Sequence, residues 1–303
     1  DALHREVLRN CGAALLLQKY LAGPEASPEA RLWLTTRGAQ PVAGRLAASA
    51  PSQAALWGLG RVIALEAPNT LAGMVDLDPD DAPETCAQRL LDELVGAGTE
   101  EQIALRGPRR FAARLTGDRR DRAGTASYRF PAQGCYLITG GLGRLGLKLA
   151  LWMAEQGAGH LVLLGRRGQT GASTPAEIQA AQAAGAEVHL VSADVSNRRQ
   201  MTALFDRFGA DLPPLRGILH AAGVIKPQPL LQLGLAALSA VCEAKVRGTW
   251  ILYDLARGRG LDFFVLFSSA AGILGARELA HYAAANHFLD AFAHWARGRE
   301  MPL

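Results

Sequence analysis

The sequence predicts an α/β protein whose larger part is a doubly wound parallel sheet, preceded by a smaller and truncated α/β block. From residue 134 onward, apolar strand-like runs alternate with helical segments of about 10–15 residues, the pattern of consecutive βαβ units. The first of these runs, CYLIT at 135–139, leads into a glycine-rich turn and then a helix. A chain of 303 residues, 49% of them hydrophobic, is also long enough for two domains.

The first block covers residues 1–115 and mixes both kinds of element. We expect strands at 32–38 and 74–78, helices at 55–68 and 83–98, and two short strands within 101–115 that join at Gly107-Pro108. Residues 116–130 are charged and poor in aliphatic side chains, which indicates a connector.

The second block, residues 131–303, carries the alternating pattern. Its expected strands, with the turns that follow them, lie at 135–141, 160–168, 187–196, 216–224 and 262–272, and its first two helices at 145–158 and 174–186. Ligands of doubly wound sheets bind at the carboxyl ends of the strands, so the residues that follow these strands are the candidate site.

The glycine-rich turn is the strongest local signal. Gly141, Gly143 and Gly146 have the GxGxxG spacing between a strand and a helix, where we expect Gly141 to allow the tight turn, Gly143 a close pyrophosphate and Gly146 close helix packing. The helix N-terminus would then face the anion with free N–H groups. The alternative is a glycine-rich turn without a ligand. The predicted dinucleotide loop comprises Thr139, Gly140, Gly141, Leu142, Gly143, Arg144, Leu145 and Gly146.

A second Gly-Leu-Gly-Arg occurs in the first block, in WGLGRVIALE at 57–66. Ile63 stands where a third glycine would be required, and no apolar strand precedes it. We therefore interpret Gly58 and Gly60 as helix-entry or packing glycines rather than as ligand-binding residues.

The second strand ends in an arginine pair that bears on cofactor choice. NAD sites usually carry an acidic residue about 20 residues past the glycine motif. Arg166 and Arg167 stand there instead, and guanidinium groups bind the 2′-phosphate of NADP(H), which a carboxylate repels. The alternative for either arginine is a solvated side chain.

Two further strand ends complete the predicted cofactor site. Asp194 is positioned to reach the adenine edge with Val195 packed on the ring, although Asp194 could equally cap the following helix. The run His220, Ala221, Ala222 and Gly223 ends the fourth strand, and its small residues would let the cofactor lie close to the backbone.

Four residues form the candidate catalytic set. Tyr282 and Asn286 are four residues apart on an expected helix and share a face, which could also be an ordinary polar face. Ser269 closes the fifth strand, thirteen residues before Tyr282. A tyrosine needs a nearby ammonium to act in proton transfer near neutral pH. Of only four lysines, Lys245 is the one on a helix just before the strand that bears Ser269.

Composition excludes several classes of function. No apolar run approaches the roughly 20 residues that span a membrane, and DALHREVLRN lacks a signal-peptide core. The net charge of +4 lies in residues 131–303, with 16 Lys+Arg against 12 Asp+Glu; it suits an anionic ligand or acidic partner but not nucleic acid. The four cysteines are far apart, so we expect a reduced, cytoplasmic setting and no metal site.

Taken together, these motifs resemble the ketoreductase domain of modular type I polyketide synthases, in the short-chain dehydrogenase/reductase superfamily. The second block carries the resemblance in TGGLGRLG, GRRG, ADVS, HAAGV, AKVRGTW, FVLFSSAAG and HYAAANHFLDA. The first block resembles the structural subdomain of that family through LWLTTRGAQ, WGLGRVIALE, VDLDP and EEQIALRGPRRFAARL.

The resemblance implies a Rossmann-type catalytic subdomain that reduces a β-ketoacyl thioester with NADPH. The substrate would be carried on the phosphopantetheine of an acyl carrier protein, beside other synthase domains, in antibiotic biosynthesis. In this family Asn takes the place of the lysine that single-domain relatives keep four residues after the tyrosine, and the lysine lies upstream. Tyr282, Asn286, Lys245 and Ser269 match that arrangement.

Two departures bear on the resemblance. Ile225-Lys226-Pro227 replaces the Leu-Asp-Asp of B-type members, and Leu266 stands where A-type members carry Trp, so the alcohol stereochemistry stays open. The chain also lacks the family's first and last strands, so we expect a piece of a longer protein. The alternative function is a reductase-inactive, epimerising or structural domain that keeps the fold.

Overall fold

The computed structural model of this chain describes residues 2–42, 50–96, 98–117, 129–166, 175–297 and 299, and these form two compact units. The first unit contains the described residues of 1–116, 225–242 and 268–299, and the second contains those of 117–224 and 243–267. Two late segments therefore belong with the first block. The cause is helix packing, because α10 (Ala280–Arg297) lies along α2 (Ala50–Glu66).

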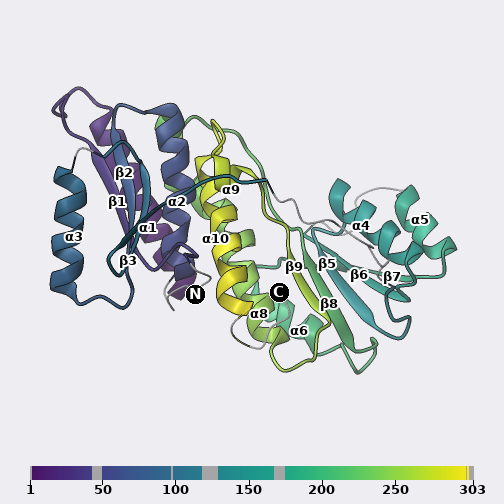
Figure 1. Cartoon of the computed structure of the whole chain (residues 1–303). Helices are drawn as coiled ribbons and strands as arrows, with labels where there is room; N and C mark the ends of the chain where they lie inside the picture. Colours follow the sequence, from purple (N-terminus) through teal and green to yellow (C-terminus); the bar gives the residue numbers. More distant parts are fainter. Residues whose placement is uncertain are drawn as a thin grey trace. The chain divides into compact units, whose positions relative to one another are not determined.

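The first unit is built on a four-stranded sheet. Its strands β1 (Leu32–Arg37), β2 (Leu71–Leu77), β3 (Gln102–Arg106) and β4 (Arg109–Ala112) lie in that order. The first three are parallel and the last closes an antiparallel hairpin, whose turn includes Gly107 with a φ of 48°. In Figure 1, α3 (Pro83–Val95) covers one side of this sheet and α2 the other. The strands and helices expected here are confirmed.

Four further elements of the described residues complete the first unit around α2 and α10. The helix α1 (Ala2–Leu21), which the sequence reading did not predict, packs on α2 and on α7 (Leu235–Cys242). The helices α9 (Ala271–Leu274) and α7 both contact α10. Glu66, the last residue of α2, accepts the backbone N–H groups of Leu230, in the 3-10 turn η1 (Leu230–Gln232), at 2.8 Å and of Glu278 at 2.6 Å.

The second unit is a five-stranded parallel sheet. Its strands are β5 (Cys135–Thr139), β6 (His160–Gly165), β7 (Glu187–Ser192), β8 (Leu215–His220) and β9 (Phe263–Leu266), in the order β7-β6-β5-β8-β9. The order reverses direction between β5 and β8, which makes their carboxyl ends the expected ligand position. This arrangement confirms the predicted doubly wound sheet.

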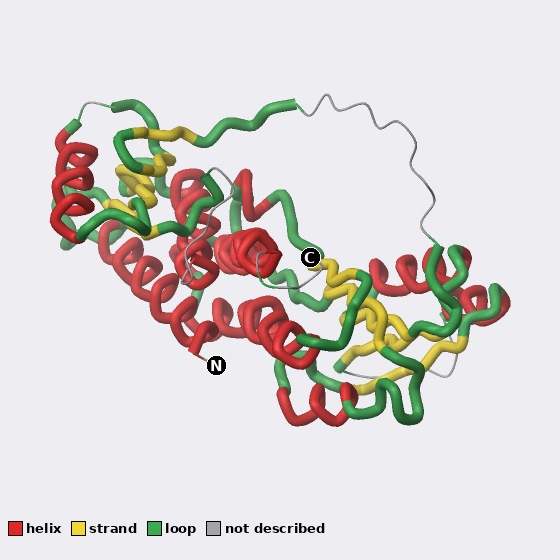
Figure 2. The backbone as a smooth tube through the Cα atoms, turned by 60° about the horizontal axis from the view of Figure 1, so that its bottom comes forward, coloured by secondary structure: helices red, strands yellow, loops and turns green. Residues whose placement is uncertain are grey.

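Helices cover both faces of this sheet. In Figures 1 and 2, α4 (Arg144–Glu155) and α5 (Ala176–Ala183) lie on one face, and α6 (Arg198–Phe205) and α8 (Gly248–Ala256) on the other. Tyr136 and Phe263 stack at a centroid distance of 5.9 Å, and Phe130 meets both rings edge-on. The alternating strands and helices predicted from 134 onward are confirmed.

No described helix combines the length and apolar character needed to cross a membrane. The four cysteines are buried thiols, and among the described residues none forms a disulfide. Burial raises the pKa of the Cys135 thiol to about 12, which keeps it protonated and unreactive.

Candidate active site

The glycine loop joins β5 to α4 in the second unit. Gly140 has a φ of 68°, and a Cβ there would lie 2.9 Å from the Ala222 nitrogen. Gly141 instead meets β6, because its Cβ would lie 2.8 Å from the Leu163 Cα. The tight left-handed turn is therefore made at Gly140, one residue before the position that the motif suggested. Gly146 packs α4 on the loop, since its Cβ would lie 2.8 Å from the Gly141 carbonyl carbon.

Gly143 leaves the start of α4 open. It is the N-cap residue of α4 and gives the helix no side-chain cap, and α4 has no acidic residue in its first turn. Within 4 Å, a Cβ on Gly143 would meet only the Gly140 carbonyl oxygen, at 3.2 Å. The backbone N–H groups of this first turn, beginning with Arg144 and the half-exposed Leu145, are thus available to an anion.

A buried hydrogen-bond chain ties the loop to the end of β8. Burial, followed by the charge of Lys245, lowers the pKa of His220 to about 3, so its imidazole is neutral. Its Nε2 faces the Ala244 carbonyl at 3.2 Å and must donate, so its Nδ1 accepts from the Thr139 hydroxyl at 2.6 Å. Thr139 Oγ1 in turn accepts from the Ala222 N–H at 3.3 Å. Thr139 and His220 therefore hold the predicted cofactor turn in place.

Lys245 lies in a π-helical turn, Glu243–Arg247, between α7 and α8. Its side chain is buried, and Nζ donates to the Phe267 carbonyl at 2.9 Å. A Cβ on Gly223 would lie 3.0 Å from Lys245 Cε, so the lysine runs along the HAAG turn. Single π-turns occur often at functional sites. Burying an ammonium costs free energy, so a buried lysine at such a turn indicates a functional role. The structure thus brings Lys245, His220 and the glycine loop together.

The remaining predicted cofactor residues differ in placement. Arg166 is exposed after β6, and Arg167 lies outside the described residues. Asp194 accepts from the backbone and the hydroxyl of Ser196 at 2.9 and 2.7 Å, whereas the N-cap of α6 is Asn197. Asp194 therefore stabilises a turn rather than capping the helix.

Val195 is buried, and its methyl groups face Gly248, where a Cβ would lie 2.9 Å away. The side chain of Val195 therefore packs on α8 of the second unit. Because this side chain is already packed, Val195 would contact an adenine ring through its backbone atoms.

The first unit holds the other three predicted catalytic residues. Ser269 Oγ accepts from the Ala271 N–H at 3.3 Å at the start of α9, which leaves the hydroxyl proton for a ligand. Tyr282 and Asn286 lie one turn apart on α10, and Asn286 Nδ2 donates to the Tyr282 carbonyl at 2.7 Å. Ser268 Oγ donates to the Asn286 carbonyl at 3.2 Å and so joins the Ser269 loop to α10.

The amide oxygen of Asn286 is an unusual group. The residue is fully buried, and its Oδ1 has no hydrogen-bond partner among the described residues. Most buried polar atoms have a partner, so this acceptor is open to a donor such as water or a ligand group. The alternative interpretation, in which Asn286 belongs to an ordinary solvated polar face, is excluded by this burial.

The Gly-Leu-Gly-Arg of the first block lies on α2 against α10. A Cβ on Gly58 would lie 2.5 Å from the Ala283 carbonyl carbon and 2.8 Å from Ala284 Cα. Gly60 faces the sheet instead, where a Cβ would lie 2.9 Å from Leu34 Cδ1. Both are packing glycines, as predicted, and Gly58 lets α2 approach the turn that follows Tyr282.

Arg61, the last residue of that motif, is a positioning residue that the sequence reading missed. Its Nη1 donates to the Gly272 carbonyl at 2.6 Å and to His287 Nδ1 at 3.0 Å. Burial lowers the pKa of Arg61 to about 10, and burial together with Arg61 lowers the pKa of His287 to about 3. Arg61 stays charged and His287 neutral at pH 7, so Arg61 of α2 ties α10 to α9, the short helix after Ser269.

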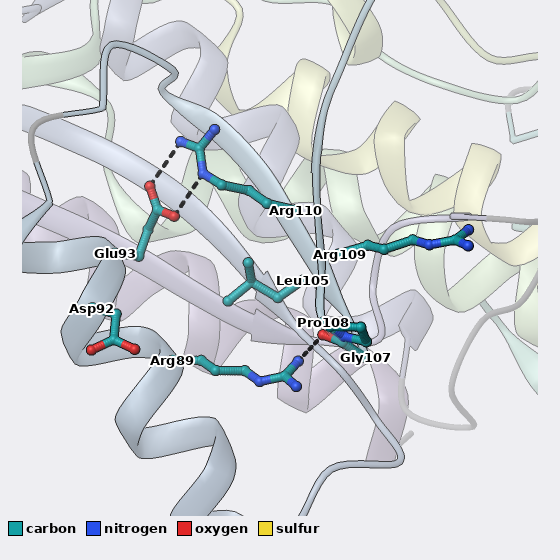
Figure 3. A pocket seen from close by; sticks show the side chains of 8 residues that line it. All are labelled: Arg89, Asp92, Glu93, Leu105, Gly107, Pro108, Arg109 and Arg110. Atoms are coloured by element: carbon teal, nitrogen blue, oxygen red, sulfur yellow. Dashed lines mark hydrogen bonds and ion pairs between the residues drawn. The ribbon is translucent and has the colours of Figure 1, made fainter.

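A shallow cavity of about 220 Å³ between α3 and the β3–β4 hairpin is one alternative location for a ligand in the first unit. Figure 3 shows Arg110 paired with Glu93 through two bonds of 2.8 and 2.9 Å, while Arg89 donates to the Gly107 carbonyl and Arg109 points away. Two of its three arginines are thus already engaged by protein oxygens, so the cavity has little positive charge left for an anion.

The strand order and the glycine loop place the second unit in the Rossmann-type class of dinucleotide folds. The KR domain family model matches residues 134–303, and the model of the Rossmann fold domain of polyketide synthase extender module SpnB matches residues 1–115. The chain therefore belongs to the ketoreductase domains of polyketide synthases, which are oxidoreductases of the short-chain dehydrogenase/reductase type.

Individual relatives agree with this family. The chain is 39% identical over 298 residues to polyketide synthase GfsA of Streptomyces halstedii, covering 97% of this chain and 4% of that protein. It is 41% identical over 287 residues to erythronolide synthase EryA3 of Saccharopolyspora erythraea, covering 94% of this chain and 9% of that protein. It thus spans a small part of these multidomain synthases.

Solved structures give the same result. An A1-type ketoreductase superposes with a TM-score of 0.86 at 37% identity, covering 96% of this chain and 60% of that one. An A-type ketoreductase from a modular polyketide synthase follows with a TM-score of 0.84 at 36% identity, covering 96% and 61%. The predicted resemblance is confirmed.

Proposed function

We propose that this chain reduces the β-keto group of an acyl thioester to a β-hydroxy group with NADPH, while the acyl chain is attached to an acyl carrier protein. The observation that carries the proposal is the buried Lys245, held 2.9 Å from the Phe267 carbonyl beside the glycine loop. A structural module has no need of a buried ammonium at the carboxyl ends of its strands. Proton transfer by a tyrosine needs one, because the positive charge lowers the pKa of the phenol.

The chain's own residues fit a dinucleotide. Gly143 and the uncapped first turn of α4 accommodate a pyrophosphate, and Gly140 and Gly223 keep the neighbouring backbone free of side chains. Arg166, with Arg167, would bind the 2′-phosphate, and the backbone at Asp194 and Val195 would line the adenine side. NADPH, when bound there, supplies the hydride that adds to the β-carbon.

Two side chains of the first unit would act on the ketone oxygen. Ser269 donates a hydrogen bond to the carbonyl, since its own oxygen already accepts from Ala271. Tyr282 gives its phenolic proton to the oxygen as the ketone becomes an alcohol. In the family arrangement that the sequence matches, the charge of a lysine stabilises the tyrosinate that remains, and we assign this role to Lys245. The buried Oδ1 of Asn286, which has no partner among the described residues, would accept a hydrogen bond from a donor such as a water that returns a proton to the site.

The substrate carrier is inferred from the family and from charge. The relatives named above are multidomain polyketide synthases, so neighbouring synthase domains and an acyl carrier protein are the expected partners. The positive balance of residues 131–303 favours an acidic partner. A reaction on a carrier-bound acyl chain also fits a domain that is one part of a longer synthase.

Two measurements distinguish reduction of a ketone from binding of NADPH alone. We expect NADPH fluorescence to change on binding, and NADPH to be oxidised by trans-1-decalone and by a carrier-bound β-ketoacyl thioester. Binding without oxidation would make the chain a reductase-inactive or epimerising domain, and undetectable binding would make it a structural module. Chiral analysis of the alcohol then gives the stereochemistry.

A further inference from the structure

Two histidines and one glutamate meet at the edge of the second unit opposite the glycine loop. His160 is the first residue of β6, and the parallel register pairs it with Glu187, the first residue of β7. His189 lies two residues further along β7 and so on the same face as Glu187. The three ligand atoms lie within 4.8 Å of one another. All three residues lie at or near the start of their strands, whereas the proposed cofactor residues follow the strand ends.

The distances suit a metal better than direct pairing. His160 Nδ1 lies 3.3 Å from Glu187 Oε2, and His189 Nε2 lies 3.3 Å from Glu187 Oε1. A charge-assisted hydrogen bond is shorter, at about 2.7–2.9 Å. In a tetrahedral zinc site with bonds of about 2.0–2.1 Å, adjacent ligand atoms lie about 3.3 Å apart. Both nitrogens are shielded from solvent and have no hydrogen-bond partner among the described residues.

The surroundings supply space and a further oxygen ligand. A cavity of about 420 Å³ is lined by the three residues and by the loop 209–214, which includes Asp211. A hydrogen bond from Arg207 lowers the pKa of Asp211, and His189 adds to this effect, so a carboxylate lies near the imidazole. Two imidazoles and one or two carboxylates form a donor set that selects zinc-class ions over magnesium or calcium.

We propose that His160, Glu187 and His189 bind a divalent zinc-class ion, with water or Asp211 as the fourth ligand. The ion cross-links β6 to β7, the edge strand of the sheet, and so stabilises the end of the sheet at which these strands begin. This site is independent of the reductase proposal, and the cysteine spacing that argued against a metal does not bear on it.

Calorimetric titration of the EDTA-treated chain with ZnCl₂ tests the site. We expect one ion per chain and a Tm that rises with the zinc concentration, because the site exists only in the folded state. His189→Gln and Glu187→Gln should each weaken binding by about 100-fold or more. His294→Gln, which removes an exposed histidine from α10, should leave binding unchanged.

Cobalt distinguishes the ligands. We expect Co²⁺ to give the visible bands of a four-coordinate site without a sulfur charge-transfer band. A sulfur band would assign the metal to the cysteines and overturn the proposal, as would the absence of stoichiometric binding or unchanged affinity in both variants. If His189→Gln fails to fold, the exposed Glu187→Gln carries the test alone.

Discussion

Replacing Gly58 with alanine should impair the reaction without touching the cofactor loop. The new Cβ would lie 2.5 Å from the Ala283 carbonyl carbon, whereas ordinary contact begins at 3.4 Å. The clash is with the backbone of α10, which cannot change rotamer as a side chain can. The two helices α2 and α10 must therefore separate by about 1 Å. Ala283 follows Tyr282, and a misplacement of about 1 Å at a catalytic group costs on the order of 100-fold in rate.

The stability change has two opposing parts. Overpacking costs about 1–3 kcal/mol, and alanine in place of a helical glycine returns about 1 kcal/mol. We therefore expect a net loss of about 0–2 kcal/mol, small enough that the variant folds. The rate, measured as NADPH oxidation by trans-1-decalone, should fall about 100-fold. The Kd of NADPH should stay unchanged, because Gly58 and the glycine loop belong to different units.

Gly60→Ala is the matched control. Alanine at this position increases the helix propensity of α2 by the same amount. Its Cβ, however, meets the side chains of Leu34 and Met74, which can change rotamer, and does not meet the backbone of α10. We expect its rate to stay within about threefold of the parent because α10 does not move. Equal rates for Gly58→Ala and the parent, or equal losses for Gly58→Ala and Gly60→Ala, would refute the positioning role of α2.

Three further predictions concern other parts of the chain. Arg166→Glu together with Arg167→Glu should raise the Kd of NADPH by at least about 10-fold and leave that of NADH nearly unchanged, since lost charge-assisted bonds cost about 1.5–3 kcal/mol; equal losses would exclude a 2′-phosphate contact. His220 and His287 have pKa values lowered to about 3, so the native state keeps both neutral while the unfolded chain takes up protons below about pH 6.5. Stability should therefore fall as the pH drops from about 6.5 toward 3, by about 2–3 kcal/mol between pH 7.5 and 5.5 in urea unfolding, and a flat profile would contradict the burial of neutral imidazoles. Glu66→Gln leaves one side-chain oxygen for the two backbone N–H groups of Leu230 and Glu278, so it should lower the free energy of unfolding by about 1–2 kcal/mol. Hydrogen exchange should become faster at these two amides, while exchange in β5 should stay unchanged.

Local patterns in the sequence were enough to predict the strands of both sheets and several of the helices, although not α1. The apolar run at 135–139, the glycine spacing and the alternation after residue 134 each depend on neighbours in the chain, and β5, α4 and the parallel sheet follow from them. Tyr282 and Asn286 share a helix face for the same reason.

The features that the sequence could not predict depend on distant contacts. Arg61 reaches Gly272 and His287 across more than 200 residues, and no local motif reports such a bond. The left-handed turn falls on Gly140, where the backbone of Ala222, just past the end of β8, leaves no room for a side chain. The π-turn that holds Lys245 is likewise not detectable in the spacing of apolar residues, because one inserted residue changes the helical phase of a short segment only slightly.

The hydrogen-bonding state of Asn286 was also beyond the sequence. Its place four residues after Tyr282 predicted a shared face, but only the packing of α10 shows that the amide oxygen is buried without a partner among the described residues. A buried acceptor of this kind turns a helix-face argument into a specific expectation of a donor at that atom.

Replacing Tyr282 with phenylalanine tests the central claim most directly. Reduction of a carrier-bound β-ketoacyl thioester should fall by about 100- to 10,000-fold, the usual contribution of a general acid, while the Kd of NADPH stays unchanged. Tyr20→Phe, which removes the hydroxyl of an exposed tyrosine on α1, should keep full activity. Full activity in Tyr282→Phe would contradict the account, because the proton would then come from another group.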